Sequence, residues 1–217
     1  MTATLYRRSG TVFIVDDDAS FLKSVSRLLS AVGYHVQAFA SAQEFLDRLA
    51  PEMPGCVVAD LQMPGMDGLE LQEALRCSAN PLPIVFLTGQ GDIPTTVSAM
   101  RGGAEDFLTK RARKEELLAA VERAMERDAQ ERRQREQLRD LRRRFNELSE
   151  RELEVLEHVV RGRMNKQIAA ELDINERTVK LHRTNITRKL QVQSVAELTR
   201  LVDEAGLFKT RNSGRTN

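Results

Sequence analysis

The sequence predicts an α/β domain with a doubly wound, five-stranded parallel sheet, followed by a small all-α domain on a long helix. In the first 125 residues, five short apolar runs alternate with five amphipathic segments, which indicates βαβ units and a sheet covered on both faces. After residue 146, four short helical patterns follow without a strand.

The net charge also changes sign along the chain. Residues 1–125 carry 12 Lys and Arg against 16 Asp and Glu, residues 126–145 carry 8 against 5, and residues 146–217 carry 13 against 11. An acidic first half joined to a basic second half predicts two domains with different partners.

The expected strands are short apolar runs, and several of them end at a polar residue. The first, Thr11–Val15, ends in three aspartates, and the third ends at Asp60. The others are expected at 35–39, 82–87 and 105–108. Helices are expected where apolar residues recur at helical spacing: from Leu22 to the stop at Gly33, from the cap Ser41 to Leu49, from Asp67 to Leu75, from Asp92, and from Lys114 onward.

The strand order 2-1-3-4-5, typical of flavodoxin-like sheets, would place strands 1, 3 and 4 side by side. Ligands bind at the carboxyl ends of strands in such sheets. This order therefore predicts that one edge gathers Asp16, Asp17, Asp60, Thr88 and Lys110. A single Asp before a stretch rich in Pro and Gly usually only opens a turn, so Asp60 gains a functional interpretation from these neighbours.

The acidic edge predicts a divalent metal. Three converging carboxylates repel one another and are stable as anions only with a cation. Oxygen ligands favour Mg²⁺, with Mn²⁺ as an alternative. A carboxylate facing such a metal can attack a phosphoryl group and form an aspartyl phosphate. Lys110 and the metal would balance the charge gained, and Thr88 would donate to a phosphoryl oxygen.

Residues 126–145 contain no Gly or Pro, so the preceding helix is expected to continue through them. Leu138, Leu141, Phe145 and Leu148 fall at the spacing of a short coiled-coil seam. A sustained seam needs several apolar heptads, and the sequence upstream is charged. A solvated linker helix is therefore favoured over a long dimeric coil.

The C-terminal segment predicts a helix-turn-helix module. A capping box, Ser149 to Glu152, starts its first helix, and a tight turn at 173–175 separates its second and third helices. The third helix has a core side of Val179, His182, Ile186 and Leu190. Its other side is basic and able to hydrogen bond, as a reader of the DNA major groove requires. That side carries Arg177, Lys180, Thr184, Thr187 and Arg188, with Leu181 at its margin. The alternative is a merely solvated charged face.

Composition excludes several protein classes. Hydrophobic residues make up 41% and charged residues 30%, which is ordinary for a globular protein. The two cysteines, Cys56 and Cys77, form no CxxC or Cys/His cluster, which argues against a disulfide framework or a zinc site. No apolar run has the length of a membrane span or a signal peptide, so no membrane partner is expected and the predicted location is the cytoplasm.

Residues 11–125 resemble the receiver domain of two-component response regulators. The matching motifs are the pair Asp16-Asp17, the stretch from Asp60 to Gly68, Thr88, and Phe107 to Lys110. The resemblance implies that Asp60 is the phosphoacceptor and Asp17 a direct Mg²⁺ ligand. It also implies that Asp16 acts through water, that the Gln62 backbone carbonyl completes the metal ligands, and that Thr88 and Phe107 form a switch pair. The family usually has Pro after the Lys, whereas this chain has Arg111, which predicts a trans peptide bond there.

Residues 148–202 resemble the LuxR-type helix-turn-helix, on the motifs that begin at Leu148, Asn165, Thr178 and Arg188. The resemblance implies that Lys180, Leu181 and Thr184 face bases, while DNA phosphates are held by Asn165, Lys166, Thr178, Arg188 and Lys189, with Arg177 on the same surface. It assigns His182 to packing, and the last helix to pairing two copies on a half-site repeat.

Together the two modules resemble the FixJ/NarL group of response regulators. The expected domains are a receiver at 1–125, a helical linker at 126–146, a DNA-binding domain at 147–208 and a flexible tail at 209–217. The expected function is a transcription regulator that a sensor histidine kinase phosphorylates and that binds double-stranded promoter DNA. It would be active as a homodimer, with RNA polymerase as a further partner, and would catalyse only its own phosphoryl transfer and dephosphorylation. The alternatives are a DNA-binding regulator with a degenerate receiver and a stand-alone phosphotransfer enzyme.

Overall fold

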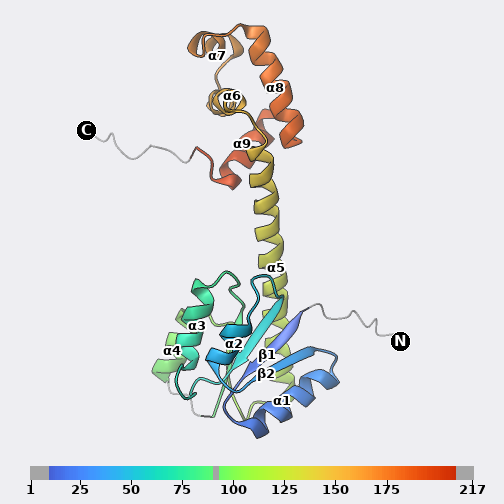
Figure 1. The fold of residues 1–217 in the computed structure, drawn as a ribbon, viewed down its shortest axis with the longest axis vertical. Coiled ribbons are helices and arrows are strands. Elements are labelled where there is room, and N and C mark those ends of the chain that lie inside the picture. The colour runs from blue at the N-terminus through green and yellow to red at the C-terminus, as the bar shows by residue number, and fades with distance from the viewer. Residues whose placement is uncertain (1–9, 90–92, 209–217) are drawn as a thin grey trace, which may run out of the picture. The chain divides into compact units, whose positions relative to one another are not determined.

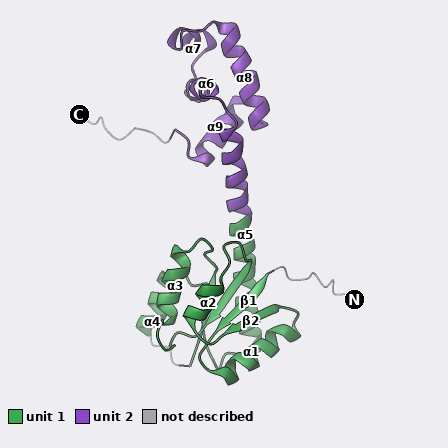
Figure 2. Ribbon diagram, in the orientation of Figure 1, with its two compact units in different colours: residues 1–132 green, residues 133–217 purple. Residues whose placement is uncertain are grey.

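The computed structural model describes residues 10–89 and 93–208. The chain forms two compact units, residues 1–132 and residues 133–217 (Figure 2). The tail expected at 209–217 and the helix start expected at Asp92 lie outside the described residues. None of the helices within the described ranges combines the length and the apolarity needed to cross a membrane.

The first unit contains the predicted five-stranded parallel sheet (Figure 1). Its strands lie in the order β2-β1-β3-β4-β5, which confirms the predicted order. Their bounds are β1 Thr11–Val15, β2 His35–Phe39, β3 Gly55–Ala59, β4 Ile84–Thr88 and β5 Asp106–Thr109. Val15 pairs with Ala59, and Ala59 pairs with Phe86. This register brings the residues that follow β1 and β3 to the same edge of the sheet.

Helices cover both faces of this sheet. Their bounds are α1 Ala19–Ala31, α2 Ala42–Arg48, α3 Gly68–Cys77, α4 Ile93–Arg101 and α5 Lys114–Asn146. One apolar core contains residues of α2, α3 and α4, including Phe45, Leu71 and Ala99. The other lies between the sheet and helices α1 and α5, and includes Leu29 and Val121. The sheet is therefore buried on both sides, as its continuous apolar strands predict.

Gly68, the first residue of α3, fits against the turn that follows β3. A Cβ atom at this position would lie 2.6 Å from the Asp60 carbonyl oxygen and 2.9 Å from the Leu61 Cα atom. Asp67 caps α3 through a capping box with Glu70. This close approach fixes the turn that carries Asp60, because a larger residue at position 68 would push the helix away from it.

The linker residues are not solvated throughout, which corrects the expectation of a solvated helix. In the first unit, Asp128 of α5 is 3% exposed and accepts a hydrogen bond from the Gly55 backbone N–H at 2.9 Å. Arg132 pairs with Asp128 at 2.8 Å and donates to Asn80 Oδ1 at 2.7 Å and to the Met53 carbonyl. This buried network attaches the end of the receiver portion of α5 to two loops of the sheet.

The second unit packs four short helices around the end of α5. Their bounds are α6 Glu150–Val160, α7 Asn165–Glu171, α8 Glu176–Leu190 and α9 Val195–Ala205. Leu141, Phe145 and Leu148 are 8%, 3% and 7% exposed and belong to the core of this unit. The apolar seam noted in the sequence is therefore buried inside one chain over these three residues. Asn175 caps α8 by accepting a hydrogen bond from the Thr178 backbone N–H at 2.8 Å.

Candidate functional site

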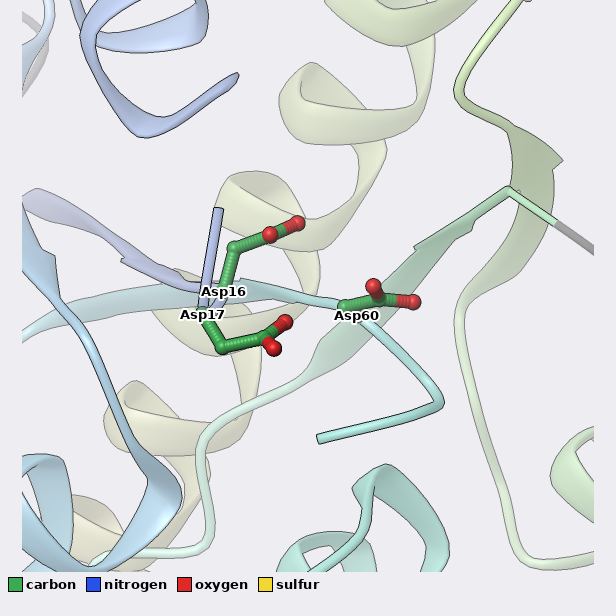
Figure 3. Close-up of side chains that lie close together, drawn as sticks. All are labelled: Asp16, Asp17 and Asp60. Carbon is green, nitrogen blue, oxygen red and sulfur yellow. The ribbon is translucent and has the colours of Figure 1, made fainter. Parts of the chain in front are cut away.

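The ends of β1 and β3 bring three carboxylates together (Figure 3). Asp16 and Asp17 follow β1, Asp60 follows β3, and one carboxylate oxygen of each lies within 4.8 Å of the others. Asp16 and Asp60 are 1% and 7% exposed, whereas Asp17 is exposed. A hollow of about 620 Å³ opens beside Asp17 and is lined in part by Gln62, Asp67 and Thr95. The predicted acidic edge is thus formed, and an open hollow adjoins it.

Lys110 lies between two of these carboxylates. Its Nζ atom is 2.6 Å from Asp16 Oδ2 and 2.8 Å from Asp60 Oδ2. Its backbone N–H donates to the Thr88 carbonyl at 2.7 Å, which continues the pairing of β5 with β4. The ammonium also lies 4.5 Å from the centre of the Phe21 ring, a contact that the sequence did not reveal. Lys110 is therefore held by two acidic neighbours and one aromatic neighbour.

The charges of this cluster are unbalanced. Burial raises the pKa of the Asp16 carboxyl, and the hydrogen bonds from Lys110 and the Asp18 backbone N–H offset this only in part. Burial lowers the pKa of the Lys110 ammonium, but the hydrogen bonds to Asp16 and Asp60 outweigh it and leave the pKa raised. Three carboxylates beside one ammonium leave an excess of negative charge in a partly buried site. A hard divalent cation with oxygen ligands fits this set of residues.

The two oxygens of Asp60 have different surroundings. Oδ1 accepts backbone N–H groups from Leu61 at 2.6 Å and Gln62 at 3.3 Å, while Oδ2 faces Lys110. Asp18 instead caps α1 through the backbone N–H groups of Ser20 and Phe21. The backbone thus orients the Asp60 carboxylate, with Oδ2 toward the other charged groups.

Thr88 and Phe107 lie on neighbouring strands at the same edge. Thr88 is 1% exposed at the end of β4, and Phe107 on β5 is half-buried. The Phe107 ring centre lies 6.1 Å from that of Phe86. No cis peptide bond occurs within the described ranges, which agrees with the trans bond expected before Arg111. With this backbone, Lys110 still reaches both Asp16 and Asp60.

Helix α8 separates apolar and polar faces as predicted. Val179, Ile186 and Leu190 are buried, and His182 is half-buried with its Nδ1 atom enclosed. The opposite face is exposed, and Leu181 is 59% exposed there. The exposed residues on it are Arg177, Lys180, Leu181, Thr184 and Arg188. An exposed Leu among charged and hydroxyl side chains suits contact with base edges and thymine methyl groups.

Four predicted phosphate-binding residues differ in whether their side chains already have hydrogen-bond partners within the second unit. Lys166 is exposed at the start of α7. Asn165 accepts a hydrogen bond from Arg183 of α8 at 2.9 Å, and the Thr178 hydroxyl donates to the Asn175 cap at 2.9 Å. Lys189 donates to Glu152 Oε2 at 2.6 Å and to the Glu147 carbonyl at 2.9 Å. Lys189 is therefore engaged inside the second unit, a contact that no local sequence signal indicates.

Two protein-family models match the sequence. The response regulator receiver domain matches residues 12–122, and the luxR family of bacterial regulatory proteins matches residues 146–202. Nodulation protein W of Bradyrhizobium diazoefficiens is 44% identical over 196 residues, which are 90% of this chain and 86% of that protein. Response regulator protein TodT of Pseudomonas putida is 42% identical with the same coverage. The solved structure of response regulator StyR aligns with a TM-score of 0.82 and 47% identity, over 90% of this chain and 99% of that chain.

Proposed function

The chain belongs to the two-component response regulators, with a receiver domain followed by a LuxR-type DNA-binding domain, and we propose on this premise that a sensor histidine kinase phosphorylates Asp60. A receiver joined to such a domain acts as a phosphorylation-dependent transcription regulator and not as a classical enzyme. The observation that carries the residue assignment is the placement of Lys110 between Asp60 and Asp16 beside Asp17.

In the proposed reaction, Asp60 Oδ2 attacks the phosphorus of the donor, and the bond from phosphorus to the donor histidine nitrogen breaks. Mg²⁺, or Mn²⁺, held by Asp16, Asp17, Asp60 and the Gln62 backbone carbonyl, would neutralise charge on the phosphoryl oxygens. Lys110 exchanges its ion pair with Asp60 Oδ2 for one with a phosphoryl oxygen, because Oδ2 becomes the bridging oxygen of the acyl phosphate. We also expect the receiver to catalyse the hydrolysis of its own aspartyl phosphate.

The proposed switch uses Thr88 and Phe107. Thr88 is the last residue of β4, the strand beside β3, and we propose that its hydroxyl moves toward a phosphoryl group on Asp60. Phe107 lies on the neighbouring strand and is half-buried, so a ring that turns inward would bury more of its apolar surface. We propose that this change alters the surface of α4 and β5 and so frees or pairs the DNA-binding domains.

The proposed partners follow from the two domains. We place the protein in the cytoplasm with its promoter DNA, and we propose a homodimer as the active form, with RNA polymerase as a contact at the promoter. The exposed apolar side chains Ile93, Val97 and Met100 of α4 support pairing of receivers, since such residues are disfavoured on a free surface. Val195, 45% exposed on α9, supports pairing through the last helix.

Lys180→Ala/Thr184→Ala is expected to weaken binding to a DNA site selected by the wild-type protein about 10- to 100-fold. The two side chains are exposed on α8, and each good base contact contributes about 1–3 kcal/mol of discrimination. Fluorescence anisotropy with the selected duplex measures the effect. Lys23→Ala, which removes one exposed charge from α1 of the first unit, is the control and should bind as the wild type does. Equal affinity of the double variant and the control would contradict this groove assignment.

Phe21→Leu is expected to lower the initial rate of phosphorylation by acetyl phosphate about threefold. The Leu side chain fills similar space but loses the cation–π contact with Lys110, which is worth about 0.5–1 kcal/mol at such a site. Phe21→Trp keeps an aromatic face and should retain the wild-type rate. Identical rates for the Leu and Trp variants would show that the ring does not position Lys110.

A further inference from the structure

Three segments of the second unit meet at one buried carboxylate. Glu152, in the first turn of α6, is 4% exposed. Its Oε2 atom accepts from Lys189 Nζ near the end of α8 at 2.6 Å and from the Ser149 backbone N–H at 2.8 Å. Lys189 Nζ also donates to the Glu147 carbonyl at 2.9 Å, just after the end of α5. The pair therefore joins α8 to the start of α6 and to the end of α5.

We propose that Glu152 and Lys189 are positioning residues that hold helix α8 in its DNA-reading orientation, and that Lys189 binds no DNA phosphate. The proposal rests on the proposed DNA-binding function and changes the role of one predicted contact residue. It also gives Glu152 a role beyond the capping box that Glu152 forms with Ser149.

The cost of breaking the pair supports this role. If Lys189 turned to a DNA phosphate, the Glu152 carboxylate, which is 4% exposed in this arrangement, would lose its cation. Removing one partner of a buried ion pair is strongly unfavourable, because the remaining charge is not compensated. Burial alone would raise the pKa of the Glu152 carboxyl, but the hydrogen bonds from Lys189 and Ser149 hold that pKa below its ordinary value. Glu152 therefore remains charged at neutral pH and retains Lys189.

The neighbouring Arg188 provides a contrast on the same turn of the helix. Arg188 is exposed, and its recorded contact is a long one, 3.4 Å to Asn185 Oδ1 within α8. A guanidinium in this position can turn to a phosphate without leaving a buried anion. Arg188 and Lys189 are adjacent cations at the end of α8, but only Arg188 is available to DNA.

The position of the pair along α8 explains how it would act. The start of α8 is fixed by the Asn175 cap, and its middle by the hydrogen bond from Arg183 to Asn165 of α7. Ile186 and Leu190 bury the core side of its last turns. Apolar contacts resist separation of the helices but tolerate small rotations, whereas the ion pair is directional. Glu152 and Lys189 thus fix the rotation of the end of α8 about its own axis.

The test is the salt dependence of DNA binding by the full-length protein. Lys189→Met is compared with Arg188→Met, using a duplex selected from random DNA by the wild type and an unselected duplex, between 50 and 200 mM salt. Loss of a phosphate contact should lower the slope of log affinity against log salt by about 0.9 and weaken both duplexes alike. We expect this result for Arg188→Met. For Lys189→Met we expect an unchanged slope and about tenfold weaker binding to the selected duplex only.

Glu152→Gln is the second variant, since Gln can still accept from the Ser149 N–H group and preserve the helix cap. This variant leaves Lys189 in place, so a positioning role predicts weaker binding to the selected duplex. The double variant Glu152→Gln/Lys189→Met should lose no more affinity for that duplex than either single variant loses. A slope lowered by Lys189→Met as much as by Arg188→Met, or tighter binding by Glu152→Gln, would overturn the proposal. A wild-type protein that enriches no duplex from random DNA would overturn the proposed function and this inference together.

Discussion

Asp60→Asn should incorporate no phosphate from acetyl phosphate and Mg²⁺, whereas the wild-type protein should gain one phosphoryl group. The neutral Asn amide is not a nucleophile toward phosphorus, so the acceptor is lost while the fold is kept. The Leu61 and Gln62 N–H groups that orient Asp60 Oδ1 can bond equally to an amide oxygen. Intact-protein mass spectrometry measures the result, and treatment with hydroxylamine identifies an acyl phosphate.

Asp18→Asn is the matched control for this experiment. Asp18 also follows β1, but its carboxylate caps α1 and makes no contact with Lys110 that the structure records. Its amide should still cap the helix, so phosphorylation should proceed at nearly the wild-type rate. A phosphoryl group that appears on Asp60→Asn would assign the acceptor to another residue. DNA binding by Asp60→Asn should match that of the unphosphorylated wild type.

Arg132→Ala should reduce the free energy of unfolding of the first unit by about 3–5 kcal/mol. The substitution removes the Arg132 guanidinium from the Asp128 carboxylate, which is 3% exposed, and removes donors to Asn80 and the Met53 carbonyl. Urea unfolding followed by tyrosine fluorescence measures this unit selectively. The chain has no Trp, and of its two tyrosines Tyr34 is buried in the first unit, at 4% exposure, while Tyr6 lies outside the described residues.

Arg133→Ala removes the same side chain one position later, where it is exposed. It should change the unfolding free energy by less than about 0.5 kcal/mol. If Arg132→Ala were no more destabilising than Arg133→Ala, the buried network would not anchor α5 to the sheet.

The sheet and the acidic edge could be predicted because their signals are local. The first and third apolar runs end directly before Asp16 and at Asp60, and a parallel strand order brings these two residues together without any knowledge of side-chain packing. The two faces of α8 were predictable for the same reason, since helical spacing alone separates Val179 from Lys180.

The contacts that escaped prediction join charged side chains to partners far apart in the sequence. Lys189 pairs with Glu152 across 37 positions, and Arg132 reaches the Met53 carbonyl across 79. The sequence around a helix-surface Lys is the same whether or not that Lys is ion-paired to a distant residue. Lys189 was therefore predicted to be one of the residues that face DNA. Similarly, helical spacing shows that Leu141 and Phe145 share a face of α5 but not what covers that face.

The burial of Leu141 and Phe145 has a consequence for recombination between regulators. The DNA-binding domain was predicted to begin at residue 147. If DNA-binding domains were exchanged between two regulators at that residue, Leu141 and Phe145 would not be transferred, and the incoming domain would pack against the corresponding residues of a different protein. Between Arg133 and Asp140, α5 carries no fully buried side chain. A crossover inside this stretch would transfer the whole core with its own helix. Chimeric regulators joined there should fold more often than those joined at residue 147.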